Sequence, residues 1–139
     1  MDLGLTGKRA LVGGGGSGIG GGIATVLADE GARVMIAGRT AARLDAMASR
    51  IGATSVVADL ASPAGPASAV AAAIEGLGGL DLLVVNSGGP PAGPFEQLDA
   101  DAWRTAIEGT LMAAVRLIEG ALPHLQSGSD PAILLNLSS

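Results

Sequence analysis

The segment from Gly13 to Gly20, GGGGSGIG, has the composition and spacing of a phosphate-binding turn. An apolar segment, residues 9–12, precedes it, and apolar residues at helical spacing follow it. Unpaired N–H groups at a helix N-terminus attract anions, and glycine permits positive φ close to a ligand. Two dinucleotide-binding spacings fit, Gly13-x-Gly15-x-x-Gly18 and Gly14-x-x-x-Gly18-x-Gly20, and we favour the second. The alternative is a merely flexible loop. The residues expected at the cofactor are Gly14, Gly16, Ser17, Gly18, Ile19 and Gly20.

Polar residues follow the other expected strands. Gly38 stands where an acidic residue would hold the ribose hydroxyls of NAD, and Arg39 comes next. Because arginine pairs with a phosphate that a carboxylate would repel, we expect NADP(H) rather than NAD. The alternative is a solvated surface arginine. Thr40 is expected at the cofactor together with Arg39, and it is also a candidate N-cap for the next helix.

Two further strand ends carry candidate contacts. Asp59 is placed to accept from the adenine amino group, with Leu60 against the ring, although a cap or turn role for Asp59 is nearly as well supported. Asn86 can bridge two strand ends and touch the cofactor, or serve as an ordinary turn residue. Ser87 and Gly88 continue this segment and are also expected at the cofactor. Five loops, those at Gly14, Arg39, Asp59, Asn86 and Ser139, should converge on one crevice.

Strand and helix alternate along the chain, which predicts one α/β domain over residues 1–139. We expect strands at 9–12, 33–37, 53–58, 80–85 and 132–137. The expected helices cover 17–30, the segment from Thr40 through Ile51, the segment from Ser62-Pro63 to the glycines at 76–79, and a long segment from Asp99 or Asp101 to Leu122 that Pro123 ends or bends. Right-handed crossovers then predict a doubly wound parallel sheet of the Rossmann type, in the order 3-2-1-4-5.

Composition excludes several classes. The net charge of −5 argues against nucleic acid, and no apolar run reaches membrane-spanning length. Nothing resembles a signal peptide, so a cytoplasmic protein is expected. There is no cysteine, and the single histidine, His124, favours no metal site. The chain has no tyrosine, and its single lysine is Lys8.

The chain resembles the N-terminal half of a short-chain dehydrogenase/reductase. That family's TGxxxGxG motif corresponds to residues 13–20, its NNAG motif to residues 86–89, and its pre-catalytic strand to residues 135–139. Residues 90–95 and 99–125 also resemble 3-oxoacyl-carrier-protein reductases. The resemblance implies an oxidoreductase that transfers hydride between NADP(H) and a small-molecule carbonyl or acyl thioester, or the corresponding alcohol.

The same resemblance implies roles for two catalytic positions. Ser139 matches the serine that orients the substrate carbonyl, and Thr110 stands where the family has an asparagine of a proton relay. The family's motif threonine is Gly13 here, so a contact that steadies the loop is expected to be missing. The family's acid tyrosine and its lysine have no counterpart in this sequence, so relative to the family the domain is incomplete.

Three hypotheses remain: an oxidoreductase, a binding module that holds a dinucleotide without turnover, and a nucleotide-free interaction domain of the same fold. A homo-oligomer is also expected through the 101–122 helix, which in the family packs against its copy. Apolar residues on this helix form a stripe wider than one face, although one face must pack on the sheet. They are Trp103, Ala106, Ile107, Leu111, Ala114, Val115, Leu117, Ile118 and Leu122.

Overall fold

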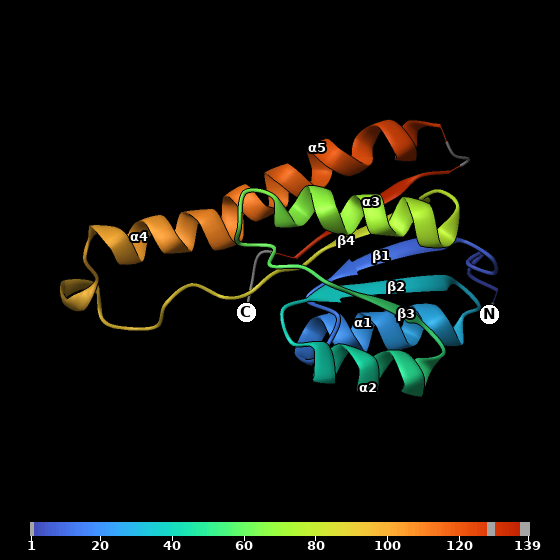
Figure 1. The fold of residues 1–139 in the computed structure, drawn as a ribbon, viewed down its shortest axis with the longest axis horizontal. Coiled ribbons are helices and arrows are strands. Elements are labelled where there is room, and N and C mark those ends of the chain that lie inside the picture. The colour runs from blue at the N-terminus through green and yellow to red at the C-terminus, as the bar shows by residue number, and fades with distance from the viewer. Residues whose placement is uncertain (1, 128–129, 137–139) are drawn as a thin grey trace.

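In the computed structural model, which describes residues 2–127 and 130–136, a parallel five-stranded sheet lies between two layers of helices (Figure 1). The strand order is β3-β2-β1-β4-β5, which confirms the predicted Rossmann-type topology. All four strand pairs are parallel, with Val12 opposite both Ile36 and Val84. The strands are β1 (Arg9–Gly13), β2 (Arg33–Gly38), β3 (Thr54–Val57), β4 (Leu82–Val85) and β5 (Ala132–Leu135).

The helices cover both faces of this sheet. The crossovers of β1 and β2 place α1 and α2 on one face, and those of β3 and β4 place α3 and α5 on the other (Figure 1). The 3-10 helix η1, the short helix α4 and the π-helix η2 precede α5, and α4 extends away from the sheet (Figure 1). The bounds are α1 (Gly18–Asp29), α2 (Ala41–Ile51), α3 (Gly65–Leu77), η1 (Phe95–Gln97), α4 (Ala100–Ala106), the π-helix η2 (Ile107–Met112) and α5 (Ala113–Gln126).

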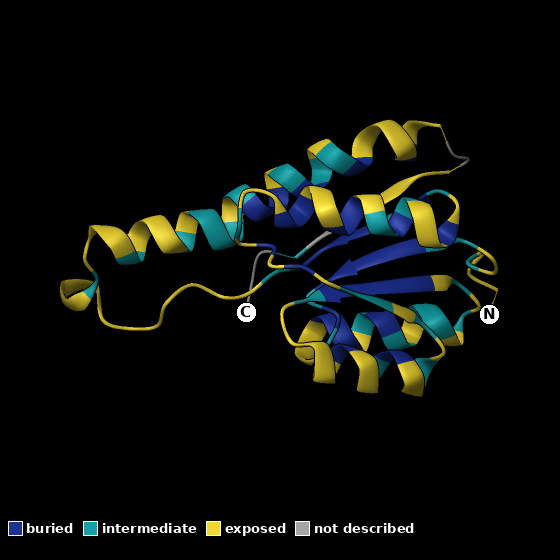
Figure 2. Cartoon of the chain, viewed as in Figure 1, coloured by how far each residue is buried: buried dark blue, intermediate teal, exposed yellow. Residues whose placement is uncertain are grey.

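Alternating side chains of the central strands build two apolar cores. Leu11, Met35 and Leu83 pack with α3 and α5, whereas Val12 and Ile36 on the opposite face pack with α1 and α2. The central strands are therefore buried on both sides, while the outer surfaces of the helices are exposed (Figure 2). This continuous burial explains why the strands read as apolar runs and not as alternating ones.

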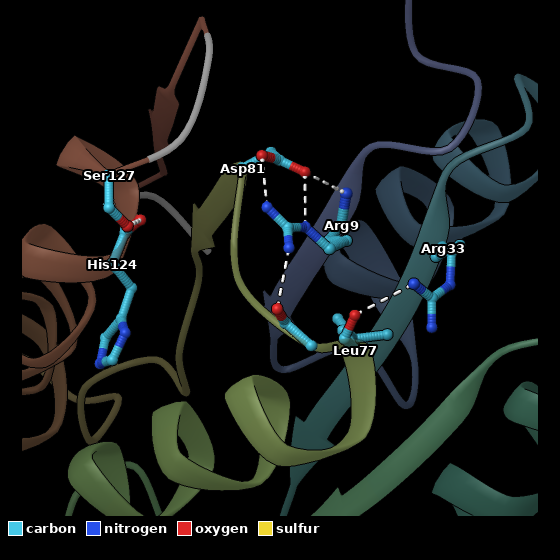
Figure 3. A network of polar contacts seen from close by, with 7 residues as sticks. Arg9, Arg33, Leu77, Asp81, His124 and Ser127 are labelled. Carbon is cyan, nitrogen blue, oxygen red and sulfur yellow. Dashed lines mark hydrogen bonds and ion pairs between the residues drawn. The ribbon is translucent and has the colours of Figure 1, made fainter.

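An ion pair joins β1 to the start of β4 at the amino-terminal edge of the sheet (Figure 3). The Arg9 side chain donates from Nε to Asp81 Oδ2 at 2.9 Å and from Nη2 to Oδ1 at 3.1 Å. The Arg9 main-chain N–H donates to the same carboxylate, and Nη1 donates to the Gly78 carbonyl. Hydrogen bonding from Arg9 holds the pKa of Asp81 below its usual value, although burial opposes this shift. The pair fixes the edge of the sheet opposite the carboxyl ends of the strands.

Two helix boundaries differ from the sequence prediction. The third helix begins at Gly65 because residues 59–62 form a hydrogen-bonded turn, so Pro66 and not Pro63 lies in its first turn. Pro123 does not end α5, which continues to Gln126 because Ala121 and Leu125 keep its last turn packed in the core. Asp99 is the N-cap of α4, and it accepts from the Ala102 N–H at 2.8 Å.

The long helix expected from the sequence consists of α4, η2 and α5, and its apolar residues are divided between the core and the surface. Ala114 and Leu117 are buried, and Ile118 packs against them, so these three belong to the core. An exposed set runs along the other side: Trp103, Ile107, Leu111, Val115 and Leu122. Within the described residues, no helix combines the length and the apolar character that crossing a membrane requires.

Candidate nucleotide-binding cleft

A cleft of about 490 Å³ opens at the carboxyl ends of the first four strands. Its walls come from the glycine turn after β1, the β2–α2 junction, the segment after β3, the loop after β4, and α4 with η2. A parallel sheet presents its ligand site at this edge, where the crossovers on its two faces diverge. The fold thus brings together segments that are up to 95 residues apart, from Gly14 to Gly109.

The glycine turn wraps the N-terminus of α1 and exposes its backbone to the cleft. Gly14 and Gly18 have φ of 59° and 56°, a conformation that favours glycine. A Cβ at Gly18 would meet no atom within 4 Å, so the backbone there faces open space. Ser17 occupies the N-cap position with no side-chain cap bond, so its hydroxyl is available to a ligand. These features suit an anion at the positive end of the α1 dipole.

Gly20 has a packing position and does not line the cleft. A Cβ there would overlap the Gly14 carbonyl oxygen and lie 2.7 Å from Asn86 Nδ2. Glycine at this position lets α1 pass directly beneath the turn. Gly20 was expected at the cofactor, and the structure instead places it behind the turn that would hold the cofactor.

Asn86 fastens the glycine turn to the sheet. It is 8% exposed, its Nδ2 donates to the Gly13 carbonyl at 3.0 Å, and its Oδ1 accepts from Asn136 Nδ2 at 2.8 Å. The amide thus joins the ends of β1 and β4 to the residue after β5, which is the bridging arrangement the sequence suggested. A Cβ at Gly13 would overlap the Asn86 carbonyl oxygen, so this backbone has no room for a threonine. The Asn86 amide supplies a tie where the motif threonine is missing.

Arg39 and Arg43 give the cleft a positive end. Both side chains line it and both are exposed. Across the described chain, every other arginine makes an ion pair or donates a side-chain hydrogen bond, whereas these two do neither. The remaining charged residue of the lining is Asp59, so the cleft is net positive within a chain of net charge −5. Two uncompensated cations on one wall form a site for a polyanion.

Asp59 and Leu60 form the wall after β3. Asp59 Oδ1 accepts from the Ala61 N–H at 3.0 Å, which is the turn role that the sequence left open for this residue. Leu60 is 5% exposed and lies under the cleft, where a flat apolar group can rest on it. The side chains of Ile19 and Leu44 add apolar surface to the same cleft.

The π-helix η2 lies beside the loop after β4. Ser87 Oγ donates to the Gly109 carbonyl at 2.8 Å, which connects that loop to the π-turn. Thr110 comes next, and its Oγ1 is buried with no hydrogen-bond partner in the described part of the structure. Thr110 does not line the cleft. The other expected catalytic residue, Ser139, lies outside the described residues.

Most of the expected cofactor residues line this single cleft. They are Gly14, Gly16, Ser17, Gly18, Ile19, Arg39, Thr40, Asp59, Leu60, Asn86, Ser87 and Gly88. Sequence reasoning missed Arg43, Gly89, Thr105 and Gly109, which also line it. For Arg43 a signal was available, because the residue lies in the first turn of the helix that follows Arg39. In the described ranges, no cluster of three or more histidine, cysteine or carboxylate side chains could hold a metal ion.

Comparison with known proteins places this geometry in a family. A family model described as short chain dehydrogenase matches residues 8–139. L-xylulose reductase from Bos taurus is 35% identical over 140 residues, which cover 100% of this chain and 56% of that protein. An uncharacterised oxidoreductase from Mycobacterium tuberculosis is 34% identical, covering 97% of this chain and 53% of that protein. The chain therefore spans about half the length of the curated relatives it matches.

Solved structures agree with this match. L-sorbose reductase from Gluconobacter frateurii, complexed with NADPH and L-sorbose, superimposes with a TM-score of 0.93 at 33% identity, over 99% of this chain and 55% of that chain. A short chain dehydrogenase from Burkholderia cenocepacia in complex with NADP has a TM-score of 0.88 at 36% identity, over 94% of this chain and 55% of that chain. With the family model matching nearly its whole length, this chain belongs to the short-chain dehydrogenase family.

Proposed function

We propose that this chain is the NADP(H)-binding portion of an oxidoreductase that interconverts a carbonyl and an alcohol on a small molecule. The observation that carries the proposal is the cleft, in which the N-terminus of α1 and two arginines without a partner among the described residues face one space. Its volume of about 490 Å³ is in the range of small-molecule sites, roughly 300–1,000 Å³. Two solved relatives that carry NADP or NADPH support the choice of cofactor.

The residues present fit such a dinucleotide. The glycine turn offers backbone N–H groups to a pyrophosphate, and the positive φ of Gly14 and Gly18 lets the backbone approach it closely. Arg39 and Arg43 are placed for the 2′-phosphate, and Leu60 supplies an apolar floor for the adenine. When bound, the nicotinamide supplies or accepts the hydride.

Substrate handling is assigned to two residues that the family resemblance singles out, Ser139 and Thr110. We assign Ser139 to orienting the reacting carbonyl through its hydroxyl. Thr110 carries a buried hydroxyl with no partner in the described chain, so it is the candidate to hold a water or a proton-relay group beside η2. No tyrosine is present to act as general acid, a role typically worth about 10²–10⁴-fold in rate. By itself this chain therefore binds the cofactor without turning substrate over, which retains the binding-module hypothesis for the isolated chain.

Calorimetric titration with NADPH and NADH tests the proposal. NADPH should bind more tightly, by the ~1.5–3 kcal/mol of hydrogen bonds to a charged group. Arg39→Ala and Arg43→Ala should each bring the two affinities closer together. Arg50→Ala is the matched control, because that exposed arginine lies on α2 outside the cleft. Equal affinities for the two cofactors, or an NADH preference, would remove the arginines from this role.

We also propose that the exposed apolar stripe on the long helix packs against a second copy of the chain. Ile107, Leu111 and Val115 follow one another at four-residue spacing and are 48%, 54% and 37% exposed. An exposed apolar row of this kind is typical of an interaction surface. Ile133 and Leu134 of the sheet-edge strand β5 are also exposed and add to the apolar surface available for association.

A further inference from the structure

A small apolar pocket lies next to the nucleotide-binding cleft, between α4 and the loop after β4. Its volume is about 140 Å³. We call this cavity the side pocket, and its lining residues are Pro90, Pro91, Leu98, Ala102, Trp103 and Ala106. The lining side chains are aliphatic except for the Trp103 ring, whose indole N–H is their single polar group, so the side pocket offers a ligand an almost wholly apolar surface.

The side pocket continues the cleft along the same two segments. On the loop, Gly88 and Gly89 line the cleft and the next two residues, both prolines, line the side pocket. On the helix, Thr105 and Gly109 line the cleft while Ala102 and Ala106 line the side pocket. These helix positions are three to four residues apart and therefore share one face. A ligand group can accordingly extend from the cleft into the side pocket without leaving the protein surface.

The far wall of the side pocket is held in place by an aromatic pair. The Phe95 and Trp103 rings contact edge to face, with centroids 6.0 Å apart and planes at 63°. They are the only aromatic residues of the chain, and both are exposed. Figure 2 shows how little of α4 is covered by the rest of the molecule. Exposed aromatic surface beside a cavity is typical of a binding site for an apolar group.

We infer that the side pocket receives an apolar substituent of the substrate, such as an alkyl or acyl chain attached to the reacting carbonyl. This inference rests on the proposed function, since it takes the cleft to hold the cofactor and the carbonyl. The side pocket is smaller than a whole small-molecule site, roughly 300–1,000 Å³, so it suits a short chain. A sugar hydroxyl placed there would lose hydrogen bonds to water, and among the lining side chains only the Trp103 indole N–H could replace one of them.

Tryptophan fluorescence provides a direct test on the chain itself. Trp103 is the single tryptophan and the chain has no tyrosine, so all such emission reports on the side pocket. The chain is titrated with 2-butanone, 2-hexanone and 2-octanone, with and without saturating NADPH. We expect affinity to rise about fourfold per added methylene until the pocket is filled, with a blue shift of the emission. L-sorbose at matched concentration should leave the emission unchanged.

Substitutions that fill the side pocket complete the test. Ala106→Leu and Ala102→Leu should each weaken 2-octanone binding at least tenfold while NADPH affinity stays unchanged, which also reports that the variants are folded. Ala100→Leu is the matched control, because Ala100 is exposed on the same helix and does not line the pocket. It should bind the ketones as the parent chain does.

Three results would overturn the inference. They are ketone affinity that does not depend on chain length, an equal response to L-sorbose, and ketone binding unaffected by both leucine variants. A fourth result would also overturn it: loss of ketone binding as the chain associates, followed by sedimentation at the same protein concentrations, would assign the side pocket to a second copy of the chain. Failure of NADPH to bind would contradict the proposed function without deciding the inference, because the ketone titration in the absence of cofactor still measures binding to the side pocket.

Discussion

Replacing Arg9 with methionine should lower the free energy of unfolding, because it removes the Arg9–Asp81 ion pair at the edge of the sheet opposite the cleft. Asp81 is 6% exposed, and the Arg9 guanidinium donates to both of its carboxylate oxygens. Methionine retains most of the aliphatic bulk of arginine but removes the charge and these donors. The buried carboxylate then keeps the hydrogen bond from the main-chain N–H of residue 9, at 2.9 Å.

The size of the effect follows from this geometry. Removing one partner of a buried pair costs roughly 3–5 kcal/mol, because the other charge is left uncompensated. Two features reduce the cost here: the Arg9 side chain is 29% exposed, and one hydrogen bond to Asp81 survives. We therefore expect the free energy of unfolding to fall by about 2–3 kcal/mol at pH 7.

The pH dependence gives the prediction a distinct signature. The pKa of Asp81 is lowered in the folded chain, chiefly by the Arg9 side-chain hydrogen bonds. Its contribution to stability is thus complete above the unfolded carboxyl pKa of about 3.9, and it is lost as pH falls through the lowered folded pKa. In Arg9→Met, burial of the carboxylate is no longer offset, and protonation relieves it. The difference in stability between parent and variant should therefore shrink as the pH is lowered from 7 towards 3.

Urea unfolding followed by far-ultraviolet circular dichroism at several pH values measures both quantities. Arg104→Met is the matched control, because its ion pair with Asp101 has side chains 74% and 87% exposed. Exposed pairs of this kind contribute little, so the control should change stability by less than about 0.5 kcal/mol. An Arg9→Met cost as small as that of the control, or a cost that stays constant with pH, would refute the reasoning.

Three further predictions concern the cleft, the helix surface and turnover. Asn86→Ala removes the side-chain donor to the Gly13 carbonyl, so the free energy of unfolding in urea should fall by about 1–3 kcal/mol and NADPH should bind more weakly; an unchanged NADPH affinity would show that this hydrogen bond is dispensable for binding. Leu111→Glu should reduce self-association at micromolar concentration in sedimentation, and a parent chain that is already monomeric throughout that range would exclude the interface. The isolated chain should not oxidise NADPH with a 3-oxoacyl thioester, because it lacks tyrosine; steady turnover by a preparation free of host reductases would contradict this.

The sheet and its order were predictable because they depend on local patterns. Apolar runs of strand length alternate with helical spacing, and right-handed crossovers leave few arrangements for such a chain. The glycine turn was also predictable, because Gly14 and Gly18 adopt positive φ, a conformation that favours glycine, and the glycines are visible in the sequence. Arg39 and Asp59 could be placed near the cleft for the same reason, because the carboxyl ends of parallel strands share one edge.

Other features depend on contacts between distant segments, which local patterns do not contain. Asn86 could be seen as a bridge, but only the fold shows that it takes up the Gly13 carbonyl and leaves no room for a side chain at residue 13. Arg9 and Asp81 are 72 residues apart, and no short-range periodicity pairs them.

The chemistry of the cleft also depends on contacts between segments that are distant in the sequence. A sequence shows which residues are arginines, but only packing shows that Arg39 and Arg43 lack partners among the described residues while the other arginines are engaged. The π-turn beside Ser87, with its buried Thr110 hydroxyl, likewise arises where the long helix meets the loop after β4. Local sequence determined the elements and their order, because backbone conformation is a short-range property. Tertiary structure decided which charges and hydrogen-bonding groups are satisfied, because each partner comes from a segment far away along the chain.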